Sequence, residues 1–262
     1  MNFYDFCYNY LLKQTLEQAK LKEDDLQKYF ECNLYSWEPY FTVTRGKETK
    51  KDLMKMFAFI LQNRFRLPSI INFCDNYENL KKILNEFDDE YIRQNNEKIH
   101  DELFKLSNNK HQKSWKQYEQ GLIDSANLLK NYNNFKDFYN KSNIEELTRI
   151  TGIGKVMARN FLKEIGKTEY GKPDIHLKSV FEIIENRPLN EQEFDEAIKK
   201  QALACDVSVY NLDRIVWLIC SGKYFKNATY LKNPNGILRK NFEEYLKNNI
   251  NKITEQTAKK IL

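Results

Sequence analysis

The residues best placed to do chemistry lie in one short stretch of the second half of the chain. Gly152, Ile153 and Gly154 interrupt a pattern of apolar residues at helical spacing, which predicts a tight turn between two helices. The amides at the start of the second helix, beside Lys155, would then form a site for an anion such as a phosphate. Asp174 comes soon after and is expected to open a third helix as its N-cap.

The helices that must position these residues can be outlined from their end signals. The first is expected to start at Ser142, because Ser142-Asn143-Ile144-Glu145 fits a capping box. The second is expected to end at Gly166, a residue type that readily takes the left-handed conformation after a helix. Helical spacing dominates the rest of the chain, and only eight Gly and five Pro interrupt it. The sequence therefore predicts an all-α fold.

The turn and the acid together resemble the helix-hairpin-helix Gly/Pro-Asp superfamily of DNA glycosylases. The hairpin of that family usually reads Leu-Pro-Gly-Val-Gly, and here it reads Ile150-Thr151-Gly152-Ile153-Gly154. The family's acid lies in Val-Asp-Thr-His, and here it lies in Pro173-Asp174-Ile175-His176. The position of the lyase lysine corresponds to Val156, and 174 − 156 = 18 is the spacing associated with endonuclease III-like members.

The resemblance implies two helical domains with the hairpin and the acid at the cleft between them. A middle domain of the six-helix type would span residues 46–134. The second domain would combine residues 1–45 and 135–262, and would carry the hairpin at 142–166 together with Asp174.

The resemblance also implies an activity, the removal of a damaged or modified base from double-stranded DNA. Gly152, Ile153, Gly154 and Lys155 would hold the phosphate backbone. Asp174 would stabilise the oxocarbenium-like transition state or orient the attacking water. The competing interpretation is that Asp174 only caps the helix that follows. Helix-hairpin-helix units also occur in non-catalytic modules that bind DNA, and such a module would not need this acid.

The hairpin helix decides which type of glycosylase is expected. A lyase needs an amine to form a Schiff base with the sugar, and Val156 has none. The expectation is therefore a monofunctional glycosylase. The alternative is a bifunctional glycosylase/lyase of the 8-oxoguanine type, because Phe161-Leu162-Lys163-Glu164-Ile165-Gly166 is similar to that branch. In that case Lys155 is one candidate to replace the missing lysine.

Residues that could touch an extruded base are less sharply indicated. Gln62 and Asn63 end a helix expected over residues 47–66, and loosely resemble the family's apolar-Gln stretch that faces the flipped-out nucleotide. Solvated amides at an ordinary helix end are the equally weighted alternative. Val156 would pack against the hairpin or the sugar. Trp37, between Tyr35 and Tyr40, could stack on the base.

No cofactor is expected to be required. The family's hairpin often holds a monovalent cation on backbone carbonyls, which Ile150 and Gly152 could supply. Many relatives carry an iron–sulfur cluster near the C-terminus, but this chain has only Cys205 and Cys220 there, so no cluster is expected. The three histidines form no zinc-ligand pattern.

Composition sets the remaining expectations. The net charge of +5 permits binding to a polyanion without requiring it. No run approaches the ~20 apolar residues of a membrane span, and the N-terminus does not read as a signal peptide. Five scattered cysteines suggest reduced thiols. We therefore expect a cytoplasmic protein, associated with the nucleoid if prokaryotic, that acts as a monomer.

Overall fold

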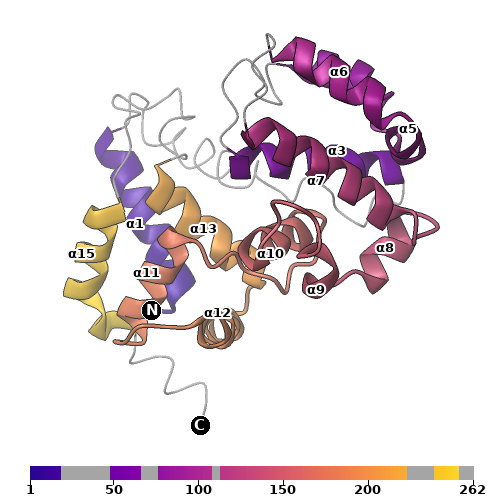
Figure 1. The fold of residues 1–262 in the computed structure, drawn as a ribbon. Coiled ribbons are helices and arrows are strands. Elements are labelled where there is room, and N and C mark those ends of the chain that lie inside the picture. Colours follow the sequence, from indigo (N-terminus) through magenta and orange to yellow (C-terminus); the bar gives the residue numbers. More distant parts are fainter. Residues whose placement is uncertain (19–47, 66–75, 108–112, 223–238, 254–262) are drawn as a thin grey trace. The chain divides into compact units, whose positions relative to one another are not determined.

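The computed structural model describes residues 1–18, 48–65, 76–107, 113–222 and 239–253 (Figure 1). Within these ranges every regular element is a helix and there is no strand, so the predicted all-α fold class is confirmed. The helices are α1 (Phe3–Gln18), α3 (Lys50–Phe65), α4 (Tyr77–Ile83), α5 (Asp89–Gln94), α6 (Asn96–Leu106), α7 (Lys113–Leu129), α8 (Phe135–Lys141), α9 (Ile144–Leu147), α10 (Lys155–Glu164), α11 (Ile175–Ile184), α12 (Glu191–Cys205), α13 (Val209–Ser221) and α15 (Arg239–Asn249).

The chain divides into two compact units, and each is described here by itself. The first unit combines Met1–Tyr40 with Thr168–Leu262. Its central element is α13, which packs against α1, α11, α12 and α15 and is buried along most of its length. Aromatic rings join the two ends of the sequence in this core. Tyr10 of α1 lies 4.9 Å from Phe242 and 4.8 Å from Tyr245 of α15, between ring centroids.

The second unit spans Phe41–Lys167, and its long helices α3 and α7 lie side by side (Figure 1). Phe57 of α3 stacks on Phe161 of α10 at 4.1 Å, and Phe138 of α8 meets both rings edge-on. These contacts explain why residues 135–167 belong with the middle of the chain. The sequence analysis took its boundary at 134 from the family resemblance. Helical periodicity could not test that boundary, because it shows that a face is buried but not which helix covers it.

Most helices begin and end at the residues that local signals indicate. Gly166 has a φ of 103° and ends α10 in a Schellman motif, in which the Lys167 amide donates to the Leu162 carbonyl at 3.0 Å. The predicted start at Ser142 is wrong by one residue. Asn143 is the N-cap of α9, and its side chain accepts from the Glu146 amide at 3.0 Å. Ser142 instead ends α8, and its carbonyl accepts from Lys167 Nζ at 2.7 Å.

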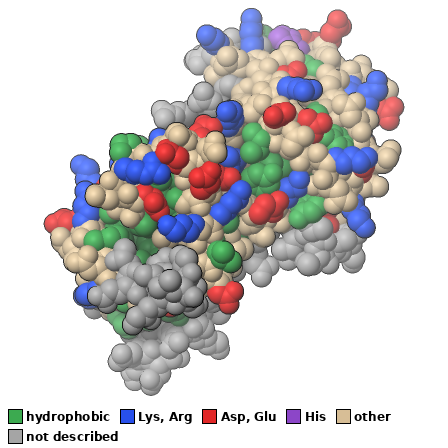
Figure 2. Space-filling view, turned by 90° about the horizontal axis from the view of Figure 1, so that it is seen from below, with side chains coloured by type: hydrophobic (Ala, Val, Ile, Leu, Met, Phe, Trp, Pro, Cys, Tyr) green, Lys and Arg blue, Asp and Glu red, His purple; other side chains and the backbone are tan. Residues whose placement is uncertain are grey.

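Among the residues that the structure describes, no helix combines the length and the apolar character needed to cross a membrane. Basic and acidic side chains alternate over the face shown in Figure 2, and apolar patches lie between them.

Candidate functional site

The hairpin between α9 and α10 has the tight geometry that its glycines predict. The Ile150 amide donates to the Leu147 carbonyl at 3.2 Å, and the Ile153 amide donates to the Ile150 carbonyl at 3.0 Å. Gly152 between them has a φ of 91°, a conformation that residues with a side chain rarely adopt. Ile150 and Ile153 are each 3% exposed, so the turn buries its apolar side chains.

Gly154 leaves the start of α10 open. It is the N-cap residue, with a φ of −88° and a ψ of 176°, and no side chain caps the helix. A Cβ atom added here would meet no other atom within 4 Å. Gly154 and Lys155 are both exposed. Because the first amides of a helix point outward and carry partial positive charge, this end of α10 is suited to an anion such as a phosphate group.

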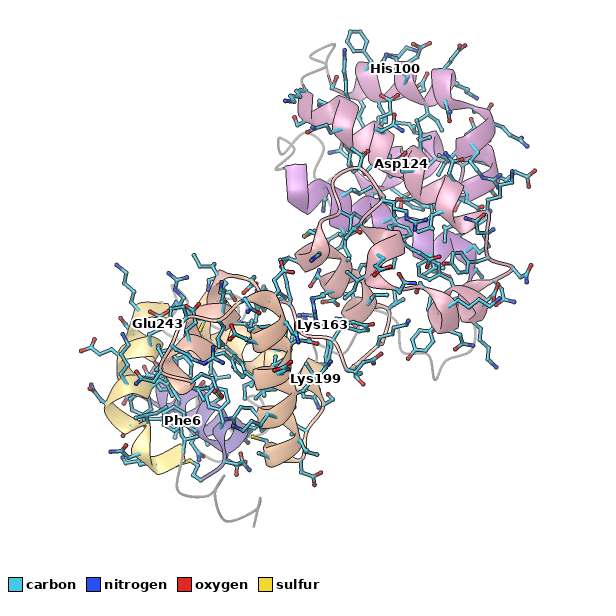
Figure 3. All side chains as sticks on the ribbon, turned by 60° about the horizontal axis from the view of Figure 1, so that its bottom comes forward. Phe6, His100, Asp124, Lys163, Lys199 and Glu243 are labelled. Carbon is cyan, nitrogen blue, oxygen red and sulfur yellow. The ribbon has the colours of Figure 1, made fainter. Side chains whose placement is uncertain are left out.

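Helix α7 fixes the hairpin from behind, which the sequence analysis did not foresee. Asp124 of α7 accepts a hydrogen bond from the Thr151 amide through Oδ2 at 2.9 Å, and Figure 3 labels it beside the hairpin loop. One turn earlier, a Cβ atom on Gly121 would lie 2.7 Å from the Thr151 carbonyl oxygen and 2.8 Å from Leu61 Cδ2. The close approach of the hairpin therefore requires a glycine in the middle of this 17-residue helix. The only sign of this contact in the sequence was a glycine within a helical pattern.

Asp174 is the N-cap of α11, as the sequence predicts. Its Oδ1 atom accepts from the amides of His176 and Leu177, at 2.9 and 3.2 Å. Its Oδ2 atom lies 3.7 Å from the ammonium nitrogen of Lys172, and the side chain is 15% exposed. One oxygen is thus held by the helix, while the other lies beside a cation at the edge of the unit's core. A carboxylate held in this way can stabilise a positive charge or orient a water molecule.

The first turn of α11 carries further charged and titratable groups. Arg239 of α15 donates to the Ile175 carbonyl at 3.2 Å, and its Nε lies 3.1 Å from Glu243, an ion pair without hydrogen-bond geometry. Burial lowers the pKa of the His176 imidazole below its ordinary value, and Arg239 and Lys172 act in the same direction against Asp174 and Glu243. His176 Nδ1 is buried and has no hydrogen-bond partner among the residues that the structure describes.

The other predicted site residues fall in several places. Gln62 is 7% exposed, so the interpretation of its amide as solvated is wrong, whereas its place at a flipped-out nucleotide stays a prediction. The side chain of Asn63 and the whole of Trp37 lie outside the described residues. Val156 is half-buried in the first turn of α10. The Ile150 carbonyl accepts from Ile153, and a cation on Ile150 and Gly152 stays a prediction.

Two of the buried cysteines are poor nucleophiles. Cys7, Cys205 and Cys220 lie in the core of the first unit and form no disulfide with one another. Burial raises the pKa of the Cys7 and Cys220 thiols, and neighbouring thiols and Glu243 raise it further, so both stay protonated at neutral pH.

The structure thus brings the predicted residues together in two groups. Gly152, Ile153, Gly154 and Lys155 form one group in the second unit, while Asp174 belongs to the first unit. The sequence analysis missed Lys172, whose amine lies beside Asp174.

No family model and no curated protein matches the sequence. Among solved structures, the chain is similar to the 8-oxoguanine glycosylase/lyase of Methanocaldococcus jannaschii, determined in complex with a 15mer DNA containing 8-oxoguanine. The two share 18% identity, the alignment covers 82% of this chain and 99% of the other, and the TM-score is 0.46. At this level of likeness, the function of this chain must be argued from its own residues.

Proposed function

We propose that the protein is a DNA glycosylase of the helix-hairpin-helix Gly/Pro-Asp type that hydrolyses the bond between a modified base and its deoxyribose. The observation that carries the proposal is how the side chain of Asp174 is held. It is a carboxylate fixed by two backbone amides, with its second oxygen beside Lys172, in a chain whose hairpin presents an open helix N-terminus. A module that only binds DNA has no need of a carboxylate fixed in this way.

The chemistry follows from these groups. Phosphates of the duplex would bind at the first turn of α10, where Gly154 allows close approach and Lys155 adds a positive charge. The modified base would leave the helical stack so that its glycosidic bond can be reached. As the C–N bond breaks, its electron pair leaves with the base, and Asp174 stabilises the positive charge on the sugar. Water then adds its hydroxyl to C1′ and its proton ends on the base, so no cofactor is needed.

The reaction is proposed to stop at the abasic site. Val156 stands where the family's lyase lysine is expected, and a valine cannot form a Schiff base. The product would be an intact strand that hot alkali cleaves at the abasic position.

A bifunctional glycosylase/lyase is the second candidate, and one observation favours it. The Lys172 amine lies 3.7 Å from Asp174 Oδ2, so a lysine is available beside the proposed acid even though Val156 is not one. Borohydride added during the reaction separates the two candidates. A covalent protein–DNA adduct that disappears in Lys172→Ala would replace the monofunctional proposal, and no adduct would support it.

Base release itself can be tested with a panel of duplexes that each contain one modified base. Product strands are treated with hot alkali and resolved by length. We expect strand cleavage for at least one lesion and none for the unmodified duplex. The proposal fails if the panel, extended to oxidised, alkylated and deaminated bases, shows no cleavage while the protein is folded and binds DNA.

The decisive variant is Asp174→Asn. Asparagine caps helices as well as aspartate does, so the melting temperature should stay nearly constant. Base release should fall by at least about a hundredfold, because the charge that stabilises the transition state is gone. Affinity for duplex should stay the same or rise, since one negative charge is removed. Near-normal turnover in this variant would reduce Asp174 to a structural cap.

A further inference from the structure

The segment that leads to Asp174 is fastened to the start of α13 and to α12. The Tyr210 amide donates to the Thr168 carbonyl at 3.0 Å. A Cβ atom added to Gly171 would lie 2.8 Å from Ile198 Cδ1 and 3.2 Å from Val209 Cγ1, so this glycine lies directly against both helices. All of these residues belong to the first unit. The segment is therefore a docked part of the core surface rather than a loosely attached connection.

Asp213 holds this segment at the point nearest to the acid. It lies in α13 between Leu212 and Arg214, in a helix that is mostly buried, and is only 1% exposed. Its Oδ2 atom accepts a hydrogen bond from the Lys172 amide at 2.6 Å. An aspartate buried in an apolar helix destabilises the fold unless it is hydrogen-bonded, and a leucine there would have no such requirement. The Lys172 amide supplies one such hydrogen bond to the Asp213 carboxylate.

The backbone of Lys172 connects Asp213 to Asp174. The Lys172 amide donates to Asp213, and the Lys172 carbonyl accepts from the Asp174 amide at 2.7 Å. Two hydrogen bonds through one backbone residue therefore join the buried carboxylate to the proposed catalytic one. Lys172 also contributes the ammonium beside Asp174 Oδ2, so its position sets two contacts of the acid.

We infer that Asp213 is a positioning residue for Asp174, acting through the backbone of Lys172. The inference rests on the proposed function for its catalytic consequence, whereas the hydrogen bonds themselves do not. Asp213 does not touch the substrate. It holds the acid in the place where the charge of the transition state develops, and a displacement of roughly 1 Å in such a group can lower a rate by about a hundredfold.

The test compares two substitutions of similar size. Asp213→Leu removes the acceptor, whereas Asp213→Asn keeps one acceptor oxygen in the same shape. We expect Asp213→Leu to lower the single-turnover rate of base release at saturating DNA by about ten- to a hundredfold, with unchanged affinity for the duplex. Asp213→Asn should restore most of the rate. Equal rates in Asp213→Leu and the unmodified protein would overturn the inference.

A second variant covers the case in which Asp213→Leu does not fold. Replacing the amide between Gly171 and Lys172 by an ester deletes the Lys172 N–H that Asp213 binds and leaves every side chain in place. The rate should fall as it does in Asp213→Leu, and Asp213→Asn should add little to the loss. A rate unaffected by the ester would also overturn the inference.

Hydrogen exchange separates a failure of this inference from a failure of the proposed function. In Asp213→Leu and in the ester variant, the amides of Asp174, His176 and Leu177 should exchange faster, while those of α12 and the rest of α13 keep their protection. A protein that releases no base but shows this local pattern would refute the glycosylase and support the positioning role. Unchanged exchange at these amides would refute the positioning role whether or not the protein is an enzyme.

Discussion

Asp174 shows how one residue can satisfy two requirements that sequence alone does not separate. A helix cap and a catalytic carboxylate both need an acid at the start of a helix. The cap uses Oδ1, which accepts from His176 and Leu177. Oδ2 takes no part in the cap and lies beside Lys172. This division of contacts between the two oxygens allows Asp174 to serve both as a cap and in the proposed reaction.

At the same scale, His176 should make stability depend on pH. Its folded pKa is lowered, chiefly by burial, from the ordinary value of about 6.5, so the unfolded chain binds more protons between the two values. Stability should be full above about pH 6.5 and should fall as the pH drops through the folded pKa. The charged groups that act on the ring are those of Asp174, Lys172, Arg239 and Glu243. A test of this pH dependence should leave all four unchanged.

Urea unfolding measured at several pH values between about 5 and 8 checks this expectation. In His176→Gln the decrease of stability below about pH 6.5 should be smaller than in the unmodified protein. Identical pH dependence in the two proteins would show that His176 titrates alike in the folded and unfolded states.

Val156 allows a gain-of-function experiment. A lysine at this position would place an amine on the first turn of α10, where lyase members of the glycosylase family that the hairpin resembles carry theirs. Val156 is half-buried but next to exposed residues, so the longer side chain can extend towards solvent. We expect Val156→Lys to form a borohydride-trapped adduct with DNA.

Val156→Lys combined with Asp174→Asn is the control, since trapping through the reaction intermediate needs base release first. An adduct that forms equally without Asp174 would show that the amine reacts with DNA outside the proposed site.

At the scale of the element, the two glycines of the hairpin have different roles. Gly152 has a φ of 91°, so a substitution there strains the backbone by roughly 1–2 kcal/mol. Gly154 has an ordinary φ and free space around its missing Cβ, so other residues fit. Loss of DNA binding in Gly152→Ala could therefore come from a damaged fold as well as from a lost contact. A substitution at Gly154 avoids this backbone strain, so it tests the contact itself.

Gly154→Ser is the sharper test of the phosphate site. Serine is a good N-cap, and its hydroxyl would accept from the amides that a phosphate would otherwise bind. We expect an unchanged or higher melting temperature together with clearly weaker binding of duplex DNA. Calorimetry and a fluorescence binding titration measure the two quantities. Full affinity in Gly154→Ser would move the DNA contact away from the start of α10.

At the scale of the whole molecule, the net charge bears on the form that the proposed DNA binding would take. The net charge of +5 is modest, and the face in Figure 2 mixes both signs. We therefore expect binding to depend on a few local phosphate contacts, with an affinity that falls as salt rises and a slope of about −0.9 per phosphate contact. Lys155→Ala should reduce the magnitude of that slope by about 1 for every DNA sequence.

Titrations at several salt concentrations with two unrelated duplex sequences check this prediction. Lys13→Ala, which changes an exposed lysine of α1, provides a matched loss of charge outside the hairpin. A slope that changes equally in both variants would attribute the effect to net charge rather than to a contact at Lys155.

The sequence by itself determined the features that depend on neighbouring residues. The all-α class, the N-cap at Asp174 and the helix end at Gly166 were all predicted. Each depends on hydrogen bonds or side-chain spacing within one or two helical turns, and residue type reports directly on such bonds. Even here a one-residue error occurred, because Ser142 and Asn143 are both capping types and only Asn143 forms the cap.

Only the tertiary structure decided the features that join distant residues. The Thr151 amide meets Asp124 across 27 residues, and the Lys172 amide meets Asp213 across 41. Phe57, Phe138 and Phe161 assign residues 135–167 to the second unit for the same reason. A periodic pattern shows that a side chain is buried but does not name its partner, because many partners fill the same space. The supports of the proposed site therefore emerged from the packing, whereas the N-cap position of Asp174 was already visible in the sequence.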